Sequence, residues 1–216
     1  MRHFTLRALW VGVALSSLFL AGPSTAAALP FSIFGTGLDG AGNPLPGGAA
    51  DPHYTVLGNP ARVLTSLPGT YFPNNPSSQW IWENANGQPT GVTRTFRTTF
   101  DLTGFDPGSA LINGLWGTDN IGVDILINGV STGIALPGVV VSNFSMLHPF
   151  AINSGFQAGL NTLDFVIRDA GVVSGFRAEL TGSANAVPEP TTLVLLGLGL
   201  GALSLARRRS WPKRDA

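Results

Sequence analysis

The 216-residue sequence has few charged residues and no cysteine. Only 11% of its residues are charged, and the 12 basic residues equal the 12 acidic ones. The lack of cysteine excludes a disulfide framework and thiolate metal sites. Residues 29–186 contain ten acidic side chains, five arginines and no lysine, which gives this segment a charge of about −5. Such an acidic segment argues against a nucleic-acid-binding protein, in which Lys and Arg are clustered.

The N-terminus has the features of a secretory signal peptide. Two arginines precede a mainly apolar run at residues 8–21, and small residues follow this run. Ala26 and Ala28 satisfy the small-residue rule for a cleavage site. The pattern predicts a signal peptide over residues 1–28, with cleavage after Ala28. Cleavage after Ala26 or Ala27 and an uncleaved membrane anchor are the alternatives.

The following region predicts a loop segment and then an all-β domain. Residues 29–52 are rich in Gly, Pro and Ala and lack sustained periodicity, so we expect a loop. In residues 53–183, short runs of β-branched and aromatic residues alternate with turn residues, which is typical of β-structure. The predicted strands lie at residues 53–57, 61–65, 79–82, 92–102, 109–117, 121–127, 163–167 and 174–181, with one or two more within 139–152.

The clearest strands show the two-residue period of a half-buried sheet. Phe96, Phe100 and Leu102 fall on one face of the strand at 92–102. An apolar residue also occupies every second position from 121 to 127, and Asn-Gly follows as a hairpin turn. Two packed antiparallel sheets bury such faces, so the sequence predicts an all-β fold, an antiparallel β-sandwich of jelly-roll type.

Four segments of this region resemble the galactose-binding-like β-sandwich modules of secreted proteins. The resemblance depends on Thr95-Phe96-Arg97-Thr98-Thr99-Phe100-Asp101-Leu102, Trp116-Gly117-Thr118-Asp119-Asn120, Ile125-Leu126-Ile127-Asn128-Gly129 and Gly159-Leu160-Asn161-Thr162-Leu163-Asp164-Phe165. It implies a sandwich fold that spans residues 94–181. It does not specify a ligand, because such modules bind varied sugars or have no known ligand.

Sugar binding by this domain requires an exposed aromatic face with polar groups beside it. Trp80 and Trp82 share one face of their predicted strand and are candidates for a stacking platform. Trp116 is a third aromatic candidate, and Asp119 and Asn120 are the candidate polar groups. The alternative for each tryptophan is packing in the core of the sandwich.

Calcium is the only ion that the sequence suggests, because oxygen ligands suffice for it. Asp119, Asn120 and Asp124 are candidate ligands, although no Asp-x-Asp-x-Asp loop is present. Turn capping and solvation of strand ends are the alternative roles of these side chains. No other cofactor is expected.

Residues for nucleophilic catalysis are scarce. The sequence has no Gly-x-Ser-x-Gly elbow and no cysteine, and only His53 and His148 remain after the signal peptide. No pair of carboxylates is distinguished by spacing for glycoside hydrolysis. We therefore expect a protein that is not an enzyme.

The C-terminus has three parts in a fixed order. A linker at residues 184–190 contains Val187-Pro188-Glu189-Pro190, an uncharged apolar run follows at 191–206, and a basic tail at 207–216 begins with Arg207-Arg208-Arg209. The 16 apolar residues would span about 24 Å as a helix, slightly less than a bilayer core of about 30 Å. The order predicts a single transmembrane helix with the arginines in the cytoplasm. An ordinary tail anchor is the alternative.

This order resembles the PEP-CTERM sorting signal of Gram-negative bacteria. The resemblance implies recognition by an integral-membrane exosortase, cleavage near Pro-Glu-Pro, and delivery to the cell surface or an exopolysaccharide matrix. Together with the signal peptide, it predicts an exported, non-enzymatic surface or matrix protein that is associated with exopolysaccharide. The alternatives are a carbohydrate-binding module, a carbohydrate-active enzyme on extracellular polysaccharide, and an adhesive subunit that self-associates through strand edges.

Overall fold

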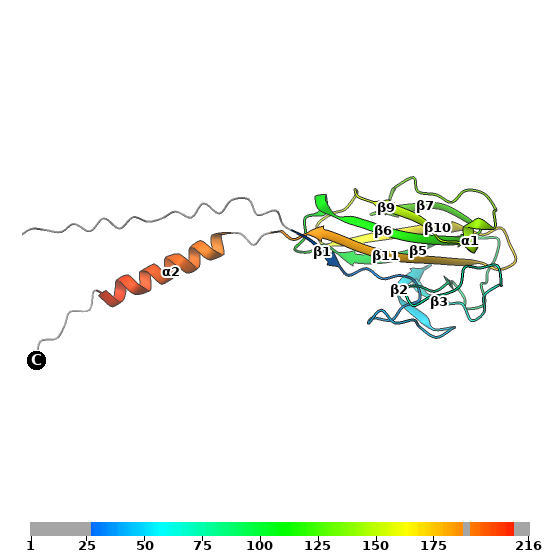
Figure 1. Cartoon of the computed structure of the whole chain (residues 1–216), viewed down its shortest axis with the longest axis horizontal. Coiled ribbons are helices and arrows are strands. Elements are labelled where there is room, and N and C mark those ends of the chain that lie inside the picture. The colour runs from blue at the N-terminus through cyan, green and yellow to red at the C-terminus, as the bar shows by residue number, and fades with distance from the viewer. Residues whose placement is uncertain (1–26, 188–190, 210–216) are drawn as a thin grey trace, which may run out of the picture.

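The computed structural model describes residues 27–187 and 191–209 (Figure 1). Most of the predicted signal peptide, with Ala26, lies outside the described residues. Pro188, Glu189 and Pro190 and the last seven residues of the predicted tail lie outside them as well.

The described residues form a β-rich domain and one long helix. The strands are β1 (Ala28–Phe31), β2 (Ala50–Val56), β3 (Asn59–Val63), β4 (Ile81–Trp82), β5 (Thr93–Asp101), β6 (Leu111–Asp119), β7 (Ile121–Ile127), β8 (Val130–Ser131), β9 (His148–Ile152), β10 (Leu160–Arg168) and β11 (Gly175–Asn185). The helices are η1 (Pro107–Ser109), α1 (Ser142–Ser145) and α2 (Thr191–Arg209). The predicted all-β character of the domain is confirmed.

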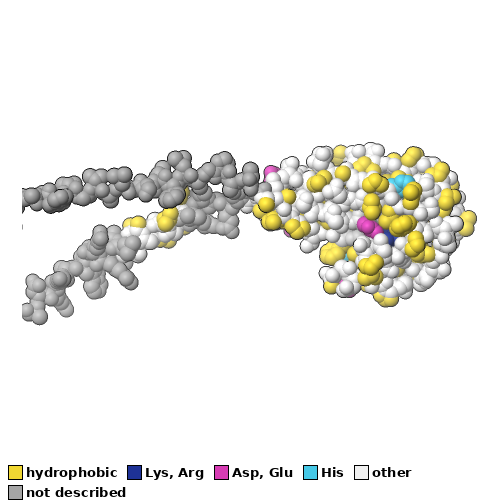
Figure 2. All heavy atoms as spheres, in the orientation of Figure 1, with side chains coloured by type: hydrophobic (Ala, Val, Ile, Leu, Met, Phe, Trp, Pro, Cys, Tyr) yellow, Lys and Arg dark blue, Asp and Glu magenta, His cyan; other side chains and the backbone are white. Residues whose placement is uncertain are grey.

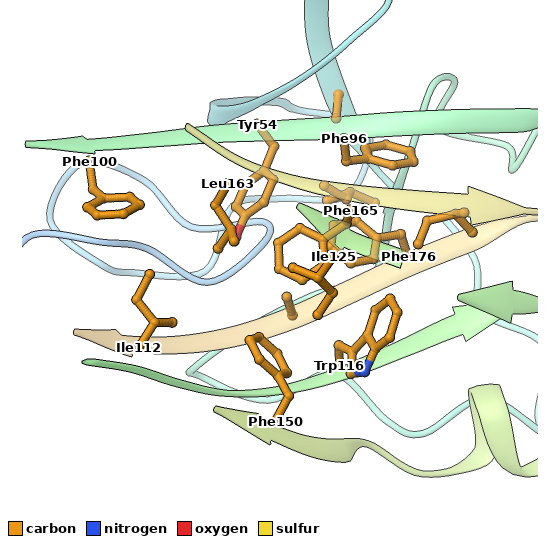
Figure 3. Close-up of a cluster of buried hydrophobic side chains, with 14 of the residues drawn as sticks. Tyr54, Phe96, Phe100, Ile112, Trp116, Ile125, Phe150, Leu163, Phe165 and Phe176 are labelled. Carbon is orange, nitrogen blue, oxygen red and sulfur yellow. The ribbon is translucent and has the colours of Figure 1, made fainter. Parts of the chain in front are cut away.

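All strand pairs are antiparallel, in the order β8-β7-β10-β5-β2-β3-β4-β11-β6-β9, with β1 on β11. Strands from distant parts of this path meet through their aromatic side chains (Figure 3). The ring centroid of Phe165 in β10 lies 4.7 Å from that of Phe176 in β11 and 5.9 Å from that of Trp116 in β6. The path therefore folds over on a shared core, which is consistent with a β-sandwich.

Two tight turns with positive φ angles connect neighbouring strands of the sheet. Asn128 and Gly129, with φ of 51° and 78°, connect β7 to β8 as the sequence predicts. Leu57 and Gly58 make the turn between β2 and β3, with φ of 51° and 76°. The turn expected at residues 58–60 is therefore one residue earlier, and Pro60 lies within β3 opposite Thr55.

The alternation expected from residue 121 to 127 is interrupted at Val123. The register between β7 and β10 shifts there, so that Val166 and Ile167 pair with Asp124 and Gly122. Val123 has no partner in this ladder and is 44% exposed. It is the extra residue of a β-bulge, which a simple two-residue period does not predict.

The N-terminal segment expected as a loop is part of the domain. β1 pairs with the end of β11, from Ala28 opposite Asn185 to Phe31 opposite Gly182. Phe31 and Leu38 are buried, so residues 29–52 contribute to the core as well as to loops. The expected loop is therefore present at residues 32–49, while β1 and the start of β2 occupy the two ends of the segment.

Residues 139–152 contain one strand, β9, as the prediction of one or two strands allows, and α1 and three exposed valines precede it. α2 begins where the apolar run begins but extends to Arg209. Among the helices that the structure describes, none meets the combined length and hydropathy of a membrane span.

Candidate functional site

The three candidate tryptophans lie in the core. Trp80, Trp82 and Trp116 have no exposed surface. The indole Nε1 of Trp80 donates to the Phe72 carbonyl at 2.8 Å, and that of Trp82 donates to the Pro89 carbonyl at 3.0 Å. β4 lies between β3 and β11 and is covered on both faces, so these indoles offer no stacking surface. The expected sugar platform of Trp80, Trp82 and Trp116 is wrong.

Asp119 and Asn120 lie in a buried polar cluster at the β6–β7 turn. The Tyr71 hydroxyl donates to Asp119 Oδ2 at 2.5 Å, and Asn120 Nδ2 donates to Asp119 Oδ1. Asn120 Oδ1 accepts from the Ala170 N–H at 2.7 Å, and its carbonyl accepts from Asn143 Nδ2 at 2.7 Å. The cluster thus connects the turn to the loops at residues 71 and 170 and to Asn143 of α1.

The surroundings of Asp119 disfavour its ionised form. Burial raises the pKa of Asp119 to about 6, the hydrogen bond from Tyr71 opposes this rise, and the charge of Asp169 adds to it. Burial and the bond to Asp119 also raise the pKa of the Tyr71 hydroxyl. None of the ion pairs among the described residues involves Asp119. The carboxyl is therefore held by neutral donors.

The calcium ligands suggested by the sequence are not assembled in the described residues. Both oxygens of Asp119 accept hydrogen bonds, from Tyr71 and from Asn120. Asp124 Oδ1 and Asp169 Oδ1 are buried without a hydrogen-bond partner. In the described ranges, no three His, Asp or Glu side chains gather as they do around a metal ion.

The two histidines outside the signal peptide contact main-chain oxygens. His53 Nε2 lies 3.1 Å from the Asp39 carbonyl oxygen, and its ring stacks on Phe34 at a centroid distance of 3.8 Å. His148 Nε2 lies 2.9 Å from the Ser142 carbonyl oxygen. Neither ring is hydrogen-bonded to a serine hydroxyl or a carboxylate of the described residues.

A charged pair on the outer face of β11 was missed by the sequence reasoning. Arg177 is fully buried, and its Nε donates to Ser78 Oγ at 2.6 Å while Nη2 donates to Glu179 Oε1 at 3.1 Å. Asn75 Nδ2 and Ser78 Oγ also donate to Glu179 Oε1, at 2.8 and 3.2 Å. Burial lowers the pKa of Arg177, and the charge of Glu179 opposes this effect. The segment around residues 72–78 thereby covers part of β11.

Glu179 lines a groove of about 450 Å³ beside this covered part. The side chains around the groove combine apolar and uncharged polar groups: Ser77, Asn113, Leu115, Pro149 and Thr181. Figure 2 shows one face of the domain, on which an acidic and a basic group lie side by side among apolar side chains. The sequence signal was the pair Arg177-x-Glu179, two charges that alternate along β11 with the buried residues Phe176 and Ala178.

The last residues before the Pro-Glu-Pro motif are held against the domain. The Val187 N–H donates to the Gly104 carbonyl at 2.8 Å, and the Asp106 N–H donates to the Asn185 carbonyl at 2.8 Å. Ala186 forms an antiparallel bridge with Phe105. After the three residues that are not described, α2 begins at Thr191, and Arg207, Arg208 and Arg209 form its end.

Residues 186–210 match the family described as the PEP-CTERM protein-sorting motif. The match includes Val187 and all of α2, so the predicted sorting motif is confirmed. The chain therefore carries the sorting signal of an exported protein that an exosortase processes. No curated protein matches the chain.

Proposed function

We propose that this protein is a non-enzymatic component of the bacterial cell surface or extracellular matrix. It is exported by its signal peptide, held in the inner membrane as a precursor, and then released by an exosortase. The observation that carries this proposal is the sorting motif at residues 186–210, which directly follows a folded β-rich domain.

The exposed surface of α2 supports membrane insertion of the precursor. The run from 191 to 206 has no charged residue on any side, and its described leucine side chains are exposed: Leu195, Leu196, Leu198, Leu200 and Leu203. A helix that is apolar on every side is stable in a membrane or in a protein core. Thinning of the bilayer and snorkelling of Arg207, Arg208 and Arg209 would compensate for its short apolar length.

The domain is proposed to act by association with exopolysaccharide, and its fold to be a jelly-roll of the galactose-binding-like kind. Its buried aromatic core supports a scaffold that is stable without disulfides. The contacts of His53 and His148 with main-chain oxygens support a role without catalysis.

Substitutions in the sorting motif test the proposal in a bacterium that produces an exosortase. Glu189→Gln, or deletion of Arg207, Arg208 and Arg209, should leave uncleaved protein in the inner membrane, because the recognition element or the cytoplasmic stop is lost. Immunoblots of membrane and surface fractions measure the outcome. Lys213→Ala, in the same tail, is the control that should be processed normally. Equal release of all variants would contradict the proposal.

The groove at Glu179 favours a second candidate function, a carbohydrate-binding module. Three donors fix Glu179 Oε1, while Oε2 has no partner among the described residues and is available to accept from a sugar hydroxyl. Leu115 and Pro149 supply an apolar surface, and Asn113 supplies a further polar group. A glycan array with the mature protein and its Glu179→Gln variant tests this function. Binding that is weakened by the substitution supports it, and a lack of binding to any glycan excludes it.

A further inference from the structure

The folded domain extends to the residue that precedes the Pro-Glu-Pro motif. β11 ends at Asn185, Ala186 is still paired with Phe105, and Val187 is still hydrogen-bonded to Gly104. There is therefore no unpaired spacer between the domain and Pro188. We use the term clasp for residues 104–109 together with residues 185–187.

The clasp is fixed from two sides. On one side, Ser109 Oγ accepts from the Asn185 N–H at 2.8 Å and donates to the Asp106 carbonyl at 2.7 Å. This hydroxyl links the β5–β6 connection to the last residue of β11. On the other side, Leu29 of β1 is paired with Ala184, next to Asn185, and this pair remains after cleavage behind Ala28.

Aromatic packing anchors the clasp to the core. The ring of Phe105 lies at a centroid distance of 6.3 Å from Phe31, and Phe31 stacks on Phe100 at 5.2 Å. Phe31 belongs to β1 and Phe100 to β5. The clasp is therefore connected to the domain by side chains as well as by main-chain hydrogen bonds.

A protease acts on main chain that is extended and unpaired, so paired residues beside a cleavage site restrict access. Cleavage that follows local opening proceeds at a rate set by the population of the open form. Building on the proposed function, we propose that the clasp limits exosortase processing: residues 185–187 must detach from residues 104–109 before the sorting motif is cleaved. Folding of the domain thereby controls release of the precursor.

An engineered disulfide tests this inference in the full-length chain. Phe105 and Ala186 are direct antiparallel partners, a geometry within the range that a disulfide bridges. The chain has no native cysteine, so the double variant Phe105→Cys/Ala186→Cys has a single pairing in the oxidising compartment. Its matched control is Phe105→Cys alone, which loses the same aromatic ring but cannot form the disulfide to residue 186.

Pulse-chase in the exosortase-producing host gives the processing rate. The locked variant should be processed at least about tenfold more slowly than Phe105→Cys, and reductant should remove the difference. Ser109→Ala, which removes a hydrogen bond of the clasp, should be processed about fivefold faster than the wild type. Thr103→Ala is its control, because the Thr103 hydroxyl bonds to Asp101 and not to residues 185–187.

The outcomes separate this inference from the proposed function. If the disulfide-linked variant Phe105→Cys/Ala186→Cys is processed as fast as Phe105→Cys, the clasp does not limit processing, and the inference is contradicted even when the wild type is processed normally. A wild-type chain that is never shortened at its C-terminus contradicts the proposed function itself. A slow locked variant with reductant-dependent recovery supports both.

Discussion

Ala28 lies directly opposite Asn185 in the antiparallel pairing of β1 with β11. The first residue is the predicted end of the signal peptide, and the second is followed at once by the sorting motif. Both predicted processing sites therefore adjoin the same end of the domain (Figure 1). Cleavage after Ala28 leaves Leu29 paired with Ala184, so the mature N-terminus still contributes to the sheet.

Loss of the Phe31 ring should destabilise the mature protein by about 3 kcal/mol, because the ring is buried against Phe100. Gly182→Ala should also destabilise it, because a Cβ at this position would lie 2.2 Å from the Phe31 ring. In a Phe31→Ala background, the cost of Gly182→Ala should largely disappear. Urea denaturation of both single variants and the double variant measures this coupling. Simple additivity would contradict the packing of β1 on β11.

The buried tryptophans should differ in their tolerance of phenylalanine. Trp82 Nε1 donates to the Pro89 carbonyl, whereas Trp116 Nε1 is buried without a partner. Trp82→Phe therefore removes the shorter of the two hydrogen bonds that the Pro89 carbonyl accepts and leaves only that from Ser174 Oγ at 3.4 Å, while Trp116→Phe removes an unpaired donor. We expect Trp82→Phe to reduce the free energy of unfolding by about 1 kcal/mol more than Trp116→Phe. Chemical denaturation of the two variants is the measurement, and the reverse order would contradict the assignment.

Stability should increase as the pH is lowered from 7 to 5. Because burial raises the pKa of Asp119 to about 6, the folded protein binds this proton more tightly than the unfolded chain does. The stabilisation is complete below the unfolded value near 4 and is lost as the pH rises through about 6. Burial also raises the pKa of Asp51, so Asp51 likewise makes the folded protein more stable at lower pH.

The corresponding experiment is the melting temperature against pH for the wild type and Asp119→Asn. The substitution should flatten the dependence between pH 5 and pH 7 without abolishing it, since Asp51 remains. Asp101→Asn is the control, because the bonds to Thr103 lower the pKa of Asp101 and keep it ionised throughout this range. An unchanged slope in Asp119→Asn would show that the cluster with Tyr71 does not control this titration.

Arg177→Ala should destabilise the domain by about 3–5 kcal/mol, as expected when one partner of a buried ion pair is removed. The guanidinium connects Ser78 and Glu179, so the segment around residues 72–78 should loosen first. Arg177→Lys should recover only part of the loss, because an ammonium does not reproduce these separate donor positions. Hydrogen exchange of residues 72–78 and urea denaturation give the two readouts. Unchanged protection of this segment in Arg177→Ala would contradict the arrangement.

The strands that were predicted well are those with local signals. The run from Ile121 to Ile127 and the turn at Asn128-Gly129 depend on residues close in sequence, and both are present in the structure. The bulge at Val123 was not predictable in the same way, because it arises from the register with β10. β1 escaped notice because its four residues become a strand only by pairing with β11, more than 150 positions away.

Among the site residues too, local sequence signals were sufficient for some predictions, while others depended on contacts between distant segments. The sorting motif is continuous in sequence, so residue order alone identified it. The exposure of Trp80 and Trp82 depends on the position of β4 in the sheet, which periodicity does not give. The two-residue strand period placed both indoles on one face of the strand, but it did not indicate that this face is buried by the rest of the domain. Arg177 was overlooked because a buried arginine requires partners, and Ser78 and Glu179 are brought to it only by the fold.

The central claim is that the chain is exported and then cut at its C-terminal sorting motif. Intact mass of the protein recovered from the cell surface tests it most directly, combined with fractionation of cytosol and membranes. The account predicts a mature species that begins at Leu29 and lacks Thr191 and all following residues. A full-length chain of 216 residues in the cytosol, with both ends intact, would contradict it.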